Sequence, residues 1–309
     1  VLDRKYSNHF GLTEEEVITG LRDYELYDTL EDVRKWYNGY RFGEADVYNP
    51  WSIINYLNRK ELGAYWVNTS NDNTINRLIG NANSSMFEDL KEIFEGKEID
   101  KTVNVFSDMS RMSSPKEIWH LMLFSGYLTT SGREDMNVYN LKIPNYEVRT
   151  FFKDSFVEYN FDDNNNFRAM INALITKNMK EYEHYLKQIM LLYLSYYDGS
   201  RIDEKPYHNL ILGSILYLED RYMIDSNIEK GFGRTDLTLT PKDRSKPGYV
   251  FEFKVVESKE RMEPGLDEAL SQMKAKRYDV RMKNEGIPEV IGIGMVFYGK
   301  QVKIRWEIL

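Results

Sequence analysis

Two carboxylates and a lysine stand at strand-like spacing in the last third of the sequence. Asp236 lies in one run of alternating apolar and polar residues, and Glu252 and Lys254 lie in the next such run. The residues between the runs, 241–248, include two prolines and a glycine, which are typical of a connecting loop. The sequence therefore predicts a hairpin that sets Asp236 roughly opposite Glu252 and Phe253.

These three polar residues are expected to share the face of the hairpin opposite its apolar side, because successive strand side chains alternate between faces. Two neighbouring carboxylates resist joint ionisation unless a cation lies between them, and their hard oxygen atoms suit Mg²⁺ or Mn²⁺. Lys254 could then orient or deprotonate a water molecule, or stabilise charge on a phosphoryl group. The alternative is a solvated strand face with an ordinary Glu–Lys pair, worth less than about 1 kcal/mol.

Helix-like segments flank the hairpin, at 206–218 before it and around 268–278 after it, and an apolar run at 290–297 follows. This order of a helix, a hairpin with Asp and Glu-x-Lys, a second helix and another strand resembles the PD-(D/E)XK nuclease superfamily. The resemblance is to the branch found fused behind an AAA-ATPase-like domain. It implies a restriction-endonuclease-like α/β core with a central mixed sheet flanked by helices.

The resemblance also implies roles for individual residues: Asp236 and Glu252 as metal ligands, Lys254 as the residue that acts on water, and Gln272 as the polar residue of the second helix that lines the site. The superfamily places a further acidic residue on the first helix. Glu204 precedes that helix here and His208 lies one turn further on, so the identity of this residue stays open.

Composition predicts a globular chain of two domains. The chain has 309 residues, of which 42% are hydrophobic and 14% aromatic. We expect a helical first domain at 1–199 and a nuclease-like domain at 200–309, because the polar turn Asp198-Gly199-Ser200 separates the two kinds of pattern. The formal net charge of -8 argues against binding to nucleic acid by bulk charge and leaves that role to local basic patches.

Several kinds of chemistry and location are disfavoured. The chain has no cysteine, so disulfides and thiolate metal sites are excluded. It has no run of 18 apolar residues and no signal-peptide pattern, which favours a cytoplasmic protein without membrane contact. The G-x-x-x-x-G-K-[ST] phosphate loop is absent as well, so we expect neither ATP binding nor ATP hydrolysis.

Two aromatic phrases in the first half carry the ATPase-like resemblance. The phrases "WYNGY" at 36–40 and "YNPWS" at 48–52 resemble segments that follow the ATP-hydrolysing core of the AAA-ATPase-like family. A helix, a hairpin and a helix between 114 and 156 predict a winged-helix-like module, and phrases in it resemble the lid region of that family. We expect apolar surface within residues 1–60 to contact either a second copy of the chain or an ATPase-like partner.

The last segments complete the expected domain. Lys274, Arg277 and Arg281 recur at helical spacing and could contact phosphates, or they could form an ordinary solvated face. The apolar run at 290–297 predicts a strand buried on both sides, and 300–306 predicts an edge strand. The sequence as a whole favours a Mg²⁺-dependent endonuclease acting on DNA or RNA. The alternative is a nuclease fold that binds nucleic acid or protein without cutting.

Overall fold

The computed structural model describes residues 7–67, 84–103, 118–135, 137–161, 164–195, 210, 213–214, 216–228, 235–299 and 301–309. The chain divides into two compact units, Val1–Tyr159 and Asn160–Leu309. The helices at 164–195 thus group with the second unit, whereas the domain division at 199 stays a prediction.

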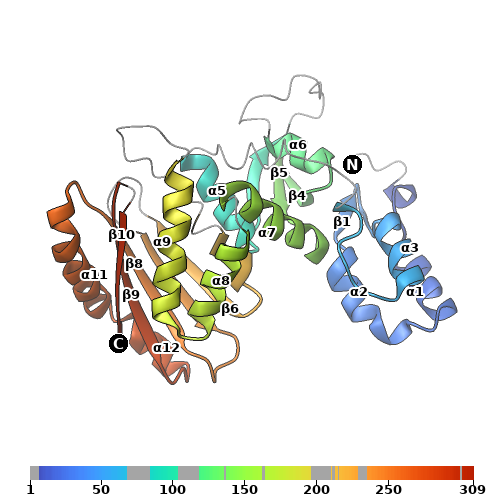
Figure 1. Ribbon diagram of the computed structural model, residues 1–309. Coiled ribbons are helices and arrows are strands. Elements are labelled where there is room, and N and C mark those ends of the chain that lie inside the picture. Colours follow the sequence, from blue (N-terminus) through green and yellow to red (C-terminus); the bar gives the residue numbers. More distant parts are fainter. Residues whose placement is uncertain are drawn as a thin grey trace. The chain divides into compact units, whose positions relative to one another are not determined.

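The first unit contains most of the described helices (Figure 1). They are α1 (Glu14–Asp23), α2 (Leu30–Tyr37), α3 (Pro50–Arg59), α5 (Ser84–Phe94), α6 (Ile118–Phe124) and α7 (Tyr146–Phe161). Its strands are β1 (Tyr40–Phe42), β2 (Ala45–Val47), β3 (Ile99–Thr102), β4 (Thr129–Asp135) and β5 (Val138–Lys142). Among the described residues, β1 and β2 form a hairpin and β3, β5 and β4 form an antiparallel sheet in that order.

Local signals in the sequence start two of these helices. Thr13 and Glu16 form a capping box at the start of α1, and the Asn49 side chain accepts hydrogen bonds from the first backbone N–H groups of α3. Pro50 occupies the first turn of α3, where its missing N–H costs nothing. In both helices the residues that satisfy the first N–H groups lie within the first turn.

One aromatic phrase of the first half, YNPWS, reaches a buried carboxylate. Glu147, near the start of α7, is fully buried and accepts a hydrogen bond from Ser52 Oγ at 2.7 Å. It also accepts hydrogen bonds from the backbone N–H groups of Tyr65 at 2.7 Å and Trp66 at 2.6 Å. Burial raises the pKa of Glu147, and these hydrogen bonds partly oppose the rise. A hydrogen bond therefore joins the YNPWS phrase to α7, which lies 95 residues later in the sequence.

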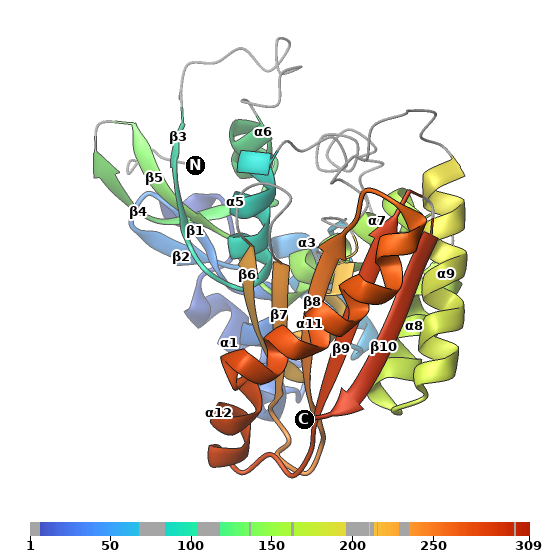
Figure 2. The same cartoon turned by 90° about the vertical axis from the view of Figure 1, so that its left-hand side faces the viewer.

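The second unit is built on a mixed sheet (Figure 2). Among the described residues this sheet has five strands in the order β10-β9-β8-β7-β6, with β8 and β9 parallel and the other pairs antiparallel. The strands are β6 (Tyr222–Ile228), β7 (Thr235–Pro241), β8 (Gly248–Val255), β9 (Val290–Tyr298) and β10 (Gln301–Ile308). The helices are α8 (Asn164–Ile175), α9 (Met179–Ser195), α11 (Met262–Lys276) and α12 (Tyr278–Asn284).

Helices cover both faces of this sheet, and α11 runs across the strands in Figure 2. Met262, Leu266 and Met273 of α11 are buried and belong to core clusters with residues of β8 and β9. On the other face, the Tyr249 hydroxyl donates to the carbonyl of Leu174 in α8 at 2.6 Å. The unit is thus a mixed α/β arrangement with a central sheet between helical layers, as expected for a nuclease-like fold.

One expectation is wrong, one strand was not expected, and one assignment stays a prediction. The predicted continuous C-terminal helix is wrong, because Arg277 adopts a left-handed conformation (φ 53°) that separates α11 from α12. Strand β6 was not predicted from the sequence. The helix–hairpin–helix order of α6, β4, β5 and α7 is present, but the winged-helix assignment itself stays a prediction.

Parts of other predictions lie outside the described residues. The expected helix at 206–218 is described only in part, and Glu204 and His208 are not among its described residues. In the described part of the chain, no helix is long and apolar enough to cross a membrane.

Candidate active site

The predicted hairpin is confirmed, and its register is sharper than the sequence alone indicated. Strands β7 and β8 pair antiparallel with Asp236 directly opposite Glu252 and Thr235 opposite Phe253. Leu237 and Phe251 are also paired, and both are buried on the face that packs toward α8 and α9. The Asp236 side chain lies outside the described part of the structure, whereas its backbone position in the register is described.

Glu252 is fully buried, which does not fit the alternative of a solvated strand face. Its neighbour in the parallel pair with β9 is Gly294, and a Cβ atom at that glycine would lie 3.1 Å from Cβ of Ala269 in α11. Val250, two residues earlier on the same face, packs in a cluster with Met273 of α11. The helix therefore covers the sheet face that carries Glu252, and a solvated strand face is excluded for this residue.

Lys254 lies close to the end of β8, where burial decreases. Its side chain is 15% exposed, and its Nζ lies 3.3 Å from Oε2 of Glu268 on α11. The other oxygen of Glu268 accepts a hydrogen bond from Nη2 of Arg261 at 3.2 Å. The lysine is thus paired with an acidic residue of the helix, not with Glu252 of its own strand.

Gln272 lies on α11 one helical turn after Glu268 and is half-buried. Residues four apart occupy the same side of a helix, so Gln272 lies on the side of α11 that Glu268 uses to contact β8. The helix thereby brings Gln272 to the flank that faces Lys254. Its expected role in lining the site stays a prediction.

The donor set fits a hard divalent cation. Mg²⁺ is commonly held by one or two carboxylates together with oxygen atoms of water and substrate. The register sets one buried carboxylate, Glu252, opposite a second acidic residue, Asp236. Among the side chains that the structure describes, no group of three or more His, Cys, Asp and Glu residues is arranged to hold a metal ion. The Asp236 side chain is not among the described side chains.

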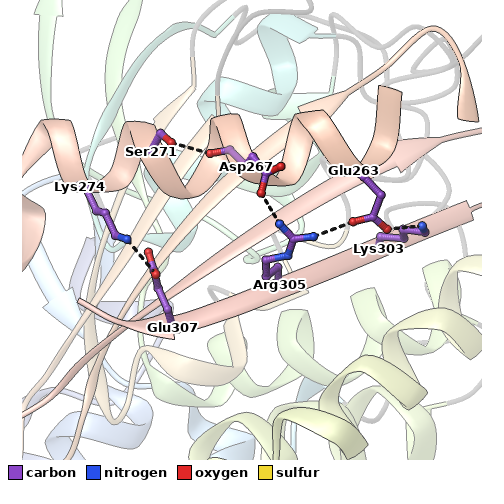
Figure 3. A network of polar contacts seen from close by, with 7 residues as sticks. All are labelled: Glu263, Asp267, Ser271, Lys274, Lys303, Arg305 and Glu307. Atoms are coloured by element: carbon purple, nitrogen blue, oxygen red, sulfur yellow. Dashed lines mark hydrogen bonds and ion pairs between the residues drawn. The ribbon is translucent and has the colours of Figure 1, made fainter. Parts of the chain in front are cut away.

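Ion pairs hold the opposite flank of α11 on the edge strand β10 (Figure 3). Arg305 contacts Asp267 and also Glu263, the latter through Nη2 at 2.6 Å. Lys303 pairs with Glu263, and Lys274 pairs with Glu307 at 2.9 Å. These contacts fix the rotation of α11 about its axis. They therefore help to decide which residues of the helix face β8.

Glu268 is the residue of this site that sequence reasoning missed. Its signal was weak because Lys254 lies 14 residues earlier, on a different element. The basic residues Lys274, Arg277 and Arg281 do not share one helix, and their contact with phosphates stays a prediction. Lys274 is ion-paired with Glu307, and Arg281 is ion-paired with Glu285 at 3.3 Å on a helix separate from α11.

Two comparisons with known proteins bear on this site. Over 308 residues the chain is 24% identical to a protein of Azotobacter chroococcum mcd 1 described as "Uncharacterized protein in vnfD 5'region". The match covers 93% of this chain and 54% of that protein, so the chain spans about half the length of this relative.

The second comparison concerns the unit that contains the hairpin and α11. Residues 202–307 match the family model of the PD-(D/E)XK nuclease superfamily. The match does not address residues 1–199, for which the ATPase-like resemblance stays a prediction. The segment that carries Asp236, Glu252 and Lys254 is therefore similar to PD-(D/E)XK nucleases, which suggests a nuclease.

Proposed function

We propose that this protein is a metal-dependent nuclease that hydrolyses phosphodiester bonds in DNA or RNA. The observation that carries the proposal is the complete burial of Glu252 directly opposite Asp236 in the β7–β8 register. A buried ionised carboxylate is costly unless it is paired or bound to a cation, and a second acidic residue opposite it increases that cost. Such an arrangement is far more typical of a cation site than of an ordinary strand face.

Each polar residue of the site has a role in this proposal. The carboxylates of Asp236 and Glu252 would hold Mg²⁺ or Mn²⁺, since residues directly opposite in an antiparallel pair have Cβ atoms about 4.5–5.5 Å apart. The bound metal would polarise the phosphoryl oxygen and lower the pKa of a bound water molecule. Lys254 would orient the attacking water and offset negative charge on the phosphate. Gln272 would line the site from α11.

The superfamily match over residues 202–307 supports the reaction class, and the donor set supports the metal. The net charge of -8 shows that substrate binding cannot rest on the overall charge of the chain. Local contacts near Lys254 and Arg261 would have to supply the phosphate binding.

The test is incubation of the purified protein with plasmid, linear and branched DNA and with RNA, in Mg²⁺, in Mn²⁺ or in EDTA. We expect cleavage of at least one substrate with metal and none with EDTA. Glu252→Gln should abolish cleavage. The matched control is Glu289→Gln, which removes a carboxylate paired with Lys177 beside Gly248, at the end of β8 remote from Lys254.

Two outcomes would count against the proposal. Cleavage of equal rate by the Glu252→Gln variant and the wild-type protein would exclude a role for this carboxylate. Binding of nucleic acid by the wild-type protein without cleavage under any of these conditions would favour the alternative, a nuclease fold that binds without cutting.

A further inference from the structure

Two consecutive acidic residues of α11 contact different strands. Asp267 pairs with Arg305 of β10, whereas Glu268 pairs with Lys254 of β8. Consecutive positions on a helix point in directions about 100° apart, so a helix lying across a sheet can present one to each side. The two carboxylates are therefore chemically alike, but they contact strands on opposite flanks of α11.

The contact with Glu268 restricts the flexible side chain of Lys254, whose orientation matters for the proposed cleavage step. Lys254 carries an ammonium group on a four-carbon stem, and such a side chain has about 2 kcal/mol of rotamer entropy. Its side chain is only 15% exposed as a whole, although the contact of its ammonium group with Glu268 lies at the surface. Glu268 Oε2, at 3.3 Å from Nζ, is a strong acceptor for one of the three ammonium hydrogens.

Glu268 is itself held from two directions. Its second oxygen accepts a hydrogen bond from Arg261, which lies immediately before α11. The ion pairs of Glu263 and Asp267 with Arg305, drawn in Figure 3, hold the same helix on β10. The Glu268 carboxylate therefore approaches Lys254 from a helix whose rotation is fixed on its far flank.

We propose that Glu268 is a positioning residue that holds the Lys254 ammonium group in the orientation needed for the cleavage step. This inference rests on the proposed nuclease function. Glu268 acts through Lys254 and does not itself contact the reacting atoms. At metal sites, groups that orient the ligand side chains typically change activity by about 10- to 100-fold when they are removed, and we expect an effect of similar size here.

The first experiment compares Glu268→Gln with Asp267→Asn, using the substrate that the wild-type protein cleaves. Both variants remove one negative charge from adjacent positions of α11. We expect Glu268→Gln to lower kcat about tenfold or more with KM changed less than about threefold. Asp267→Asn should leave kcat within about twofold of wild type, because Arg305 keeps its ion pair with Glu263 and α11 stays held on β10.

The second experiment does not depend on cleavage. The ¹H–¹⁵N signal of the Lys254 ammonium group is recorded by NMR and assigned by its disappearance in Lys254→Met. We expect this signal to be present in the wild-type protein and in Asp267→Asn, and to be lost through exchange with water in Glu268→Gln.

The combined outcomes separate the two proposals. An unchanged Lys254 signal in Glu268→Gln would overturn the positioning role, whatever the activity. A raised or unchanged kcat in that variant would also overturn it. Loss of the signal in Glu268→Gln, together with a wild-type protein that cleaves no substrate, would support the positioning contact and refute the nuclease function.

Discussion

Replacement of the buried Glu147 should separate the contribution of its hydrogen bonds from that of its charge. In Glu147→Ala, the Ser52 hydroxyl and the backbone N–H groups of Tyr65 and Trp66 lose their acceptor. A buried donor left without an acceptor costs about 1–3 kcal/mol. Two of the three donors are only partly buried, so we expect a total loss of about 3–5 kcal/mol in the free energy of unfolding of the first unit.

Glu147→Gln should cost much less. The amide oxygen can accept from both backbone N–H groups, and the amide nitrogen can donate to the Ser52 hydroxyl, which serves equally as an acceptor. The variant loses the charge assistance of the hydrogen bonds but no longer buries an ionised group. We therefore expect a change of less than about 1.5 kcal/mol near neutral pH.

The pH dependence of stability follows from the direction of the pKa shift. Burial, the main cause, raises the pKa of Glu147 in the folded protein above its unfolded value, so the folded state binds the proton more tightly. The contribution of Glu147 to the stability of the folded state is fully present below its pKa in the unfolded chain. It is lost as pH rises through its pKa in the folded protein. The stability of wild type relative to Glu147→Gln should therefore fall as pH rises above 4.5, the ordinary pKa of a glutamate side chain.

Urea unfolding followed by tryptophan fluorescence measures this effect in the right unit. Of the five tryptophans, only Trp306 lies in the second unit, so a Trp306→Phe background makes the signal specific to the first. Equal destabilisation by the Ala and Gln variants would refute the hydrogen-bond argument. A wild-type curve parallel to that of Glu147→Gln from acid to neutral pH would refute the pKa argument.

Three further predictions concern the second unit. Lys254→Met should lower the cleavage rate by about 100-fold or more while leaving Mg²⁺ affinity in calorimetry unchanged. An equal loss of Mg²⁺ affinity in Lys254→Met and Glu252→Gln would contradict the assignment of metal binding to Glu252 and of water orientation to Lys254. Arg305→Ala removes the contacts to Glu263 and Asp267, so it should lower the Tm of the second unit in dilute buffer, and the difference from wild type should shrink in about 1 M NaCl. Arg277→Gly should raise the free energy of unfolding by about 1 kcal/mol, because glycine adopts the left-handed conformation without strain, whereas Arg277→Ala should give no gain.

The elements found from the sequence are those specified by local signals. The β7–β8 hairpin follows from two alternating runs around a loop with prolines, and β9 follows from an uninterrupted apolar run. In each case the deciding residues lie within about one turn or one strand of each other, so no knowledge of distant contacts was needed.

The elements that were missed depend on distant partners. Strand β6 carries Asp225, Ser226 and Asn227 in its middle, and it is a strand because it pairs with β7 at the edge of the sheet. The helix break at Arg277 has no glycine or proline to mark it. The pairing of Lys254 with Glu268 depends on how α11 crosses the sheet, which the packing of the helix decides.

The decrease in burial along β8 predicts that different parts of the site open to solvent at different rates. Residues 248–253 of this central strand are buried, whereas Lys254 and Val255 are half-buried. Amide hydrogens in the middle of such a strand exchange with solvent only through large-scale opening, while those near its end exchange through local fraying. The Glu252 amide should therefore exchange orders of magnitude more slowly than amides just beyond Val255. The carboxylate then belongs to the slowest-opening part of the unit, and the lysine lies at its boundary, where a substrate can be admitted without opening the core.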